Sequence, residues 1–201
     1  MNWIELTRNE KYIMGVDEVG RGPLFGGVVS AAVLMPKNIY LVGINDSKKL
    51  SAKKRELFYK EIFHSALAIG FGYVDEKIID EINILEATKL AMIDAINNAS
   101  KIQKPDLILV DSVKLDGFSN LYSFNHGDEL SYNIASASII AKQARDALCY
   151  GWEKMFPGYD ILSNKGYGTK KHYLGIDEHG ITPLHRRSFL KKYEAAKQSS
   201  R

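Results

Sequence analysis

Cysteine is almost absent from this chain, because Cys149 is the only one among 201 residues. A single thiol excludes an intrachain disulfide and a zinc site built from several cysteines, and it is typical of a reducing compartment. No apolar run approaches the roughly 20 residues that span a bilayer. The charged start MNWIELTRNEKY also lacks the apolar stretch of a secretory signal. We therefore expect a cytoplasmic protein with no membrane partner.

Internal repeats and low-complexity linkers are also missing, which favours a single domain over residues 1–201. The composition, 45% hydrophobic and 25% charged, is sufficient for a sizeable core. The net charge is only +3, but residues 151–201 carry 10 lysines and arginines against 5 acidic residues. We predict a basic helical and loop-rich C-terminal segment at about 150–197. Its charge suits a polyanionic partner, although a solvated lysine-rich tail would have the same composition.

Hydrophobic patterns predict a mixed α/β domain. Apolar runs indicate strands at 11–19, 26–36, 66–74 and 105–111. Helical spacing predicts one helix capped by Ser51, a second over 83–99, a third from Glu129 to about Leu148, and a last one near 188–197. The apolar residues expected on the inner faces of the first three helices are Leu57, Phe58, Ile62, Leu85, Met92, Ile96, Leu130, Ile134, Ala137, Ala141, Ala144 and Leu148. Strands that come first and then alternate with helices favour one sheet covered on both faces.

Four acidic residues stand at or near predicted strand ends. Asp17 and Glu18 are adjacent in the first strand, Asp111 ends the strand at 105–111, and Asp128 precedes the third helix. Catalytic side chains of α/β folds often lie at strand ends, where loops open a cleft. Carboxylates that converge there need cations, and Mg²⁺ or Mn²⁺ suits such oxygen ligands.

Each acid also has a structural interpretation. Asp111 could end a strand in a turn, and Asp128 could be only an N-cap. Strand alternation sends Asp17 and Glu18 to opposite faces, so they share one site only if the chain bends, which the following glycines permit. A further acid, Asp146, lies too far along the predicted helix and is expected to pair with a nearby basic side chain.

The motifs of the chain resemble those of the ribonuclease HII family, the bacterial type 2 ribonucleases H. The similar segments are GVDEVGRGPLFGGVV, DSKKLS, NILEATKLAM, LILVDS, GDELSYNIASASIIAKQARDAL, KGYGT and PLHRRSF. They follow the order of the family over roughly residues 12–190. The resemblance implies a ribonuclease H-like fold, with a mixed five-stranded sheet flanked by helices and a C-terminal helical segment. It also points to a monomer.

The resemblance further implies endonucleolytic hydrolysis of RNA in RNA–DNA duplexes, including incision on the 5′ side of one ribonucleotide embedded in duplex DNA. By motif position, the four family acids fall on Asp17, Glu18, Asp111 and Asp128 as catalytic residues and metal ligands. Two Mg²⁺ or Mn²⁺ ions roughly 4 Å apart would activate water and stabilise the leaving 3′-oxygen. The products would carry a 3′-hydroxyl and a 5′-phosphate.

Substrate contacts are implied around a glycine-rich turn. Gly20-Arg21-Gly22 would meet the ribose at the RNA-to-DNA step, because glycines let the backbone approach and bond the 2′-hydroxyl. Arg21 would hold the adjacent phosphate, and Tyr167 in KGYGT would pack under the sugar. The candidates for phosphate contacts are Ser47, Lys48, Lys49, Lys165, Arg186 and Arg187. His185 is expected to be a phosphate or structural residue.

Four other functions are compatible with parts of the pattern. Ribonuclease HIII, which prefers longer hybrids, has an N-terminal extension and lacks the GRG sequence. A junction resolvase would not need the GRG turn and the tyrosine to sense a 2′-hydroxyl, and a non-catalytic binding module would not need four acids. A small-molecule phosphatase fits the basic C-terminal quarter less well. No sliding-clamp-binding motif is visible in KKYEAAKQSSR.

Overall fold

A computed structural model describes residues 10–39, 41, 43–44 and 50–199, with the backbone alone at Asp128, Leu130 and residues 198–199. Its centre is one five-stranded mixed sheet with the strand order β3-β2-β1-β4-β5. The strands are β1 (Ile13–Val19), β2 (Val28–Leu34), β3 (Ala68–Val74), β4 (Leu107–Asp111) and β5 (Leu121–Phe124). The α/β class and the five-stranded mixed sheet agree with the sequence-based expectation.

The pairing of β1 places the two acidic strand ends together. β1 runs antiparallel to β2, from Met14 opposite Leu34 to Val19 opposite Val29. It runs parallel to β4, where the last pair is Val16 and Val110. Because parallel strands end at the same edge of a sheet, the carboxyl ends of β1 and β4 lie side by side in the middle of the fold.

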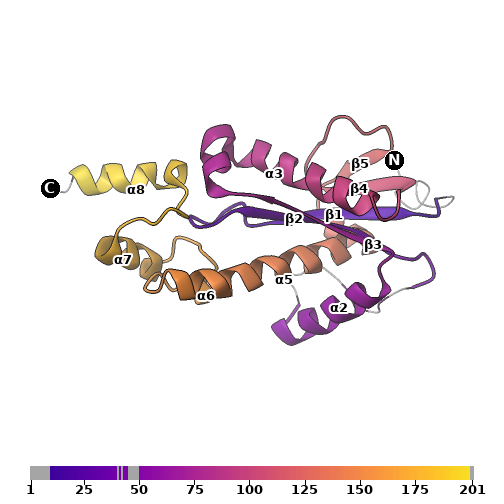
Figure 1. The fold of residues 1–201 in the computed structure, drawn as a ribbon, viewed down its shortest axis with the longest axis horizontal. Helices are drawn as coiled ribbons and strands as arrows, with labels where there is room; N and C mark the ends of the chain where they lie inside the picture. Colours follow the sequence, from indigo (N-terminus) through magenta and orange to yellow (C-terminus); the bar gives the residue numbers. More distant parts are fainter. Residues whose placement is uncertain (1–9, 40, 42, 45–49, 200–201) are drawn as a thin grey trace.

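Helices cover both faces of the sheet, as Figure 1 shows. The helices are α2 (Ala52–Ser65), α3 (Glu76–Ser100), α4 (Gly127–Leu130), α5 (Tyr132–Met155), α6 (Ile161–Asn164), α7 (Lys170–His179) and α8 (Arg187–Ser199). α3 packs on one face, where Met92 and Ile96 join Val16 and Val110 in a buried cluster. α5 and α2 cover the other face. None of the helices in the described part of the chain has the length and apolar character to cross a membrane.

Gly15 lets α5 lie directly against β1. A Cβ atom at this position would stand 2.0 Å from the carbonyl carbon of Asn133 and 2.3 Å from the amide nitrogen of Ile134. No side chain larger than hydrogen fits this space, so the glycine determines the distance between the sheet and the N-terminal end of α5. The distance matters because both elements contribute to the acidic region described below.

Several boundaries differ from the sequence-based expectation. Ser51 caps α2 as predicted, and its hydroxyl accepts the amide of Lys54. α3, however, begins at Glu76, and a kink at Asn83 (φ 70°) divides it. The Asn83 side chain caps the second part by accepting the amides of residues 85 and 86. Three apolar side chains predicted to be inside are exposed instead, namely Leu57, Leu85 and Leu148.

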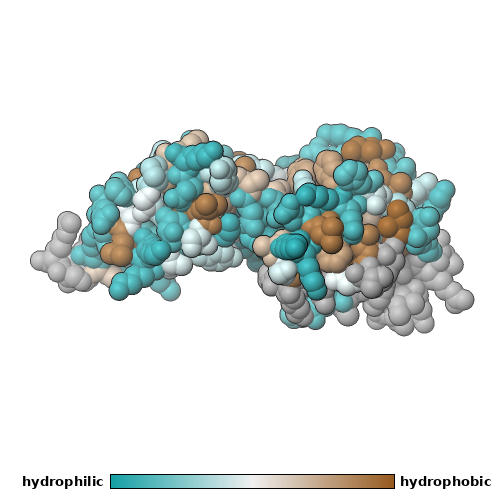
Figure 2. All heavy atoms as spheres, turned by 90° about the horizontal axis from the view of Figure 1, so that it is seen from below, coloured by the Kyte–Doolittle hydropathy of each residue, from teal (hydrophilic) through white to brown (hydrophobic). Residues whose placement is uncertain are grey.

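The C-terminal segment extends the fold beyond the sheet, with α6, α7 and α8 at the far end of α5 (Figure 1). It has its own apolar cluster, which includes Phe25, Trp152, Tyr159, Ile176 and Leu190. Phe25 comes from the loop after β1, so this cluster joins the segment to the central strands. Figure 2 shows polar and apolar residues interspersed over the face drawn, with a narrower waist between the two parts.

Candidate active site

Asp17 and Asp111 are neighbours across the two central strands. Each follows the last parallel pair, Val16 and Val110, and adjacent strands lie about 4.8 Å apart. Both side chains lie on the face of the sheet that α5 covers. Asp17 is two residues after Gly15, which faces α5, and Asp111 is two residues after Leu109, which packs with Ile134 of α5.

Glu18 lies on the opposite side of the strand, toward α3. The β1–β2 ladder continues without interruption through Glu18 and Val19, so the bend that would bring both side chains to one face does not occur within the pair. The chain turns only afterwards, at Gly20, whose φ is 97°. Glu18 nevertheless stands close enough to Asp111 to feel its charge, because both lie at the end of the sheet.

Burial and mutual repulsion disfavour the charged forms of two of these acids. Asp17 is only 6% exposed. Its pKa is raised well above the usual value, first by burial and then by the charge of Glu18, with a smaller contribution from Asp111. Burial also raises the pKa of Glu18, with Asp111 adding to the effect and Arg21 opposing it. The charges of Glu18 and Asp111 therefore disfavour ionisation of Asp17, and a bound cation would oppose that effect.

Asp111 also fixes the segment that carries the fourth acid. Its Oδ1 accepts the amide of Gly127 at 2.8 Å, which holds the start of α4 against the end of β4. The backbone of Asp128 is therefore adjacent to Asp111, although its side chain is outside the described part of the chain. The alternative interpretation of Asp128 as an N-cap does not hold, because Ser131 caps α5 and Asp128 lies within α4.

The donor set fits a divalent cation. Glu18 Oε2 is buried and has no hydrogen-bond partner among the described residues. Such an atom is costly unless a cation or donor reaches it. Among the side chains that the structure describes, no three acids, histidines or cysteines are grouped so that they could hold a metal ion by themselves. The three carboxylates, all oxygen donors, suit Mg²⁺ or Mn²⁺ better than softer metals.

The GRG turn begins immediately after the acids and lies under Tyr167. A Cβ atom on Gly22 would stand 3.0 Å from the Tyr167 ring, so the glycine permits close contact with an aromatic side chain that is 49% exposed. Leu24 donates its amide to the carbonyl of Gly166 at 2.8 Å, which joins the turn to the KGYGT loop. Arg21 approaches Glu18, with 3.4 Å between its Nη1 and Oε1.

The predicted phosphate contacts have different surroundings. Ser47, Lys48 and Lys49 lie outside the described residues. Arg187 is exposed, and Lys165 lies 4.0 Å from Asp146. Asp146 itself pairs with Lys142 at 2.5 Å, so its predicted pairing with a basic side chain is confirmed.

Arg186 requires a correction, because its side chain is 0% exposed and donates to backbone carbonyls of residues 20, 21 and 26. A guanidinium enclosed in this way cannot reach a phosphate without leaving the interior. His185 is likewise buried, and its Nε2 lies 3.1 Å from Nε2 of His172. Of the two roles expected for His185, its surroundings favour the structural one over a phosphate contact.

Sequence patterns did not identify Arg145 as part of this region. It lies on α5 and is 1% exposed, and its guanidinium donates to the carbonyls of Phe25, Gly27 and Lys165. Arginine near the middle of an amphipathic helix usually indicates a solvated position. The only signal available was its place on the same helix side as Ala141 and Cys149, four residues away in each direction.

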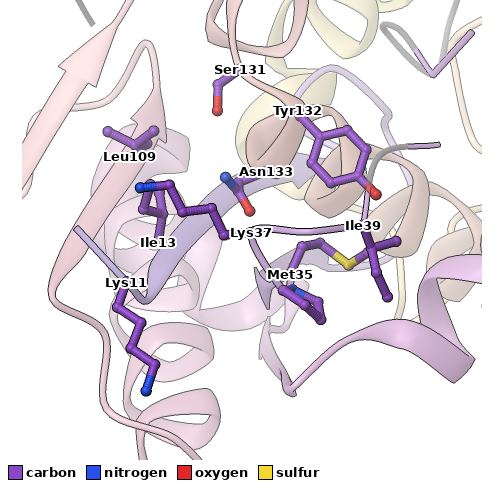
Figure 3. A pocket seen from close by; sticks show the side chains of 10 residues that line it. Lys11, Ile13, Met35, Lys37, Ile39, Leu109, Ser131, Tyr132 and Asn133 are labelled. Atoms are coloured by element: carbon purple, nitrogen blue, oxygen red, sulfur yellow. The ribbon is translucent and has the colours of Figure 1, made fainter. Parts of the chain in front are cut away.

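A cavity of about 230 Å³ lies elsewhere, at the opposite end of β1. Ile13, Met35 and Leu109 form its apolar floor, and Figure 3 shows Asn133 pointing into it from the start of α5. It opens at the beginning of the strand that ends in Asp17 and Glu18. The cavity is therefore separate from the acidic region.

Comparison with known proteins gives a consistent result. Residues 14–192 match the family described as Ribonuclease HII. The chain is 50% identical over 182 residues to Ribonuclease HII of Enterococcus faecalis, covering 90% of this chain and 71% of the relative. It is 51% identical over 179 residues to Ribonuclease HII of Listeria monocytogenes, covering 89% and 68%.

Solved structures support the same fold. The ribonuclease H2 of Pyrococcus horikoshii superposes with a TM-score of 0.75 at 26% identity, covering 92% of this chain and 98% of the other. A ribonuclease HII from Archaeoglobus fulgidus, solved in complex with PCNA, gives 0.73 at 25% identity and covers 87% and 93%. Bst-RNase HIII, solved in complex with Mn²⁺, gives 0.61 at 18% identity, covering 84% and 63%, and shows the fold alone.

Proposed function

Because the chain belongs to the ribonuclease HII family, it is an endonuclease of the ribonuclease H class, and we propose that it also incises duplex DNA on the 5′ side of a single embedded ribonucleotide. RNA–DNA hybrids and ribonucleotide-containing DNA duplexes are thus its proposed substrates. The observation that carries this proposal is the position of the acids. Asp17 and Glu18 lie directly before a turn whose backbone can meet a ribose, and Asp111 lies beside them at the end of the neighbouring strand β4.

The acids are the proposed cation ligands. Asp17, Glu18 and Asp111, joined by Asp128 from α4, would hold divalent metal as Mg²⁺ or Mn²⁺. Bound metal would supply an activated water and stabilisation of the leaving 3′-oxygen, leaving a 3′-hydroxyl and a 5′-phosphate. Asp111 also orients α4 through the Gly127 amide, and Ser138 hydrogen-bonds Asp17. The protein therefore prepares the positions of its carboxylates before the phosphodiester arrives.

The turn supplies the proposed recognition of ribose. Within the part of the chain that the structure describes, the amides of Arg21 and Gly22 donate to no protein acceptor. Gly22 is exposed beside the Tyr167 ring. Free amides next to an exposed aromatic ring suit a sugar whose 2′-hydroxyl accepts a hydrogen bond while its carbon face packs on the ring. A deoxyribose at this position would leave those amides unpaired.

The decisive experiment uses end-labelled duplex DNA with one internal ribonucleotide, incubated with Mg²⁺ or Mn²⁺. An all-DNA duplex serves as the substrate control. Asp17→Asn removes one proposed ligand, and Asp94→Asn, an exposed acid on α3, is the matched control variant. We expect cleavage 5′ of the ribonucleotide by the wild type and by Asp94→Asn, and none by Asp17→Asn or on all-DNA.

Other outcomes would overturn specific parts of the proposal. Cleavage restricted to long RNA–DNA hybrids would match the substrate preference of ribonuclease HIII and would reject incision at a single ribonucleotide. Tight binding without cleavage in either metal would reject catalysis by these acids. Full activity of Asp17→Asn would remove that carboxylate from the proposed ligand set.

A further inference from the structure

Two fully buried arginines bind the loop that follows β1, over residues 20–27. Arg186, directly before α8, donates to the carbonyls of Gly20 at 2.6 Å, Arg21 at 2.9 Å and Gly26 at 2.7 Å. Arg145, from α5, donates to the carbonyls of Phe25 at 3.1 Å and Gly27 at 3.4 Å. The two guanidinium groups, one from α5 and one from the residue before α8, therefore bind five carbonyls of one eight-residue loop.

As purely structural elements, these two buried arginines would lower the stability of the fold. Neither forms an ion pair with a carboxylate among the described residues, and burial of an unpaired charge costs several kcal/mol. Burial and the nearby Arg145 charge lower the pKa of Arg186 to about 9, so the group remains charged at neutral pH. Apolar residues would fill the same volume at lower cost, but they would not orient peptide groups.

Orientation of the peptide groups is what the contacts accomplish. In a trans peptide the C=O and the next N–H point in opposite directions, and none of the peptide bonds is cis among the described residues. Because the Gly20 carbonyl points at Arg186, the Arg21 amide points away from it. The Arg21 carbonyl also points at Arg186, so the Gly22 amide points away as well. Both amides therefore have no acceptor in the part of the protein that the structure describes.

The charge also changes the strength of those donors. A cation bound to a carbonyl polarises its peptide group, and a polarised N–H forms a stronger hydrogen bond. Arg145 extends the same arrangement to the aromatic side of the turn, because its Nη1 donates to the Lys165 carbonyl at 2.8 Å. Lys165 is two residues before Tyr167, so one guanidinium holds both the glycine-rich loop and the loop of the tyrosine.

We propose that Arg186, supported by Arg145, is a positioning residue that fixes the Arg21 and Gly22 amides toward the ribose and thereby sets the preference for ribonucleotides. This inference rests on the proposed function, since it assumes that the turn meets the 2′-hydroxyl. It assigns Arg186 no contact with substrate. Its effect is therefore on selectivity for ribose and not on affinity for the phosphate backbone.

Binding measurements without divalent metal separate these two effects. The dissociation constants of a duplex with one ribonucleotide and of an all-DNA duplex are measured for wild type, Arg186→Lys and Met92→Ala. Lysine keeps the charge but lacks the rigid planar fork with which the guanidinium directs separate donors at the three carbonyls. Met92→Ala lowers stability through the core beneath α3 and leaves the loop intact, so it controls for loss of stability.

The selectivity is the dissociation constant of the all-DNA duplex divided by that of the duplex with one ribonucleotide. We expect Arg186→Lys to lower this ratio by about 3- to 10-fold for each hydrogen bond lost to the ribose. Affinity for all-DNA should stay the same, and Met92→Ala should keep the wild-type ratio. An unchanged ratio in folded Arg186→Lys would overturn the inference. An equal loss of affinity for both duplexes would also overturn it, because that is the signature of a phosphate contact.

Failure of the proposed function would look different, because the wild type itself would not distinguish the duplexes or cleave beside the ribonucleotide. If Arg186→Lys does not fold, Arg145→Lys is measured in the same way. Hydrogen exchange of the Arg186 guanidinium protons in the wild type gives a test that needs no variant. Protection in both free and ribonucleotide-bound protein supports the inference, and protection lost on binding overturns it.

Discussion

Alanine at position 15 is expected to separate the sheet from α5. Its Cβ atom would stand 2.0 Å from the carbonyl carbon of Asn133, whereas ordinary contact begins at 3.4 Å. The helix must therefore move by about 1.4 Å, and it cannot respond by a side-chain rotation because the contact is with backbone. Overpacking costs about 1–3 kcal/mol where side chains can adjust. We expect Gly15→Ala to lose about 3 kcal/mol of unfolding free energy or more.

The same displacement would reach the catalytic region. Asp17 lies on β1 and α4 directly precedes α5, and a 1 Å misplacement of catalytic groups can lower rates about 100-fold. The matched control is Gly151→Ala on α5, where the added Cβ meets nothing within 4 Å and alanine should stabilise the helix by about 1 kcal/mol. Urea unfolding followed by circular dichroism, together with the cleavage assay, measures both effects. Stability within about 0.5 kcal/mol of wild type and undiminished cleavage in Gly15→Ala would refute the packing argument.

Three further predictions concern acid sensitivity, capping and metal. Burial, then the charge of His172, lowers the pKa of His185 from 6.5 to about 4, so the unfolded chain takes up the proton first. The contribution of neutral His185 to the free energy of unfolding is complete above pH 6.5. It is lost as the pH falls toward 4, by about 3 kcal/mol. Urea titrations from pH 7.5 to 4 should show a smaller loss in His185→Gln, and parallel curves would contradict this. Asp80 accepts the amides of residues 187 and 188 and thereby caps the start of α8. Asp80→Ala should therefore lower the free energy of unfolding by about 2 kcal/mol, measured by thermal melts, whereas Glu81→Ala, at an exposed position, should not. Equal melting temperatures of the two variants would argue against the cap. Mg²⁺ or Mn²⁺ at 100 times its Kd should raise the wild-type Tm by roughly 5–10 °C, and an equal rise in Asp17→Asn would count against that carboxylate as a ligand.

The sequence predicted the sheet and the acidic strand ends because their signals are local. Continuous apolar runs mark β1, β2 and β4, and Asp111 follows such a run directly. β5 was not apparent from its own pattern, since its four residues are half-exposed or exposed. The start of α5 was misplaced because helical spacing continues from Glu129 through the break at Ser131, where only the capping hydroxyl shows that a new helix begins.

Long-range contacts could not be predicted in this way. Arg186 looks like one of several basic residues in PLHRRSF, and only the fold shows that it is buried while Arg187 beside it is exposed. Which of two neighbouring side chains is buried depends on the part of the protein that packs against the segment. The partners here, the carbonyls of residues 20 and 21, lie 166 and 165 positions earlier in the chain. No window of local sequence contains both.

That separation has a consequence for truncated forms of the protein. A chain shortened before Arg186 keeps the residues of β1 to β5 and of the acidic region, but it lacks the guanidinium that binds the carbonyls of Gly20 and Arg21. The proposed selectivity for ribose therefore depends on a segment that contributes no strand to the sheet and none of the proposed metal ligands.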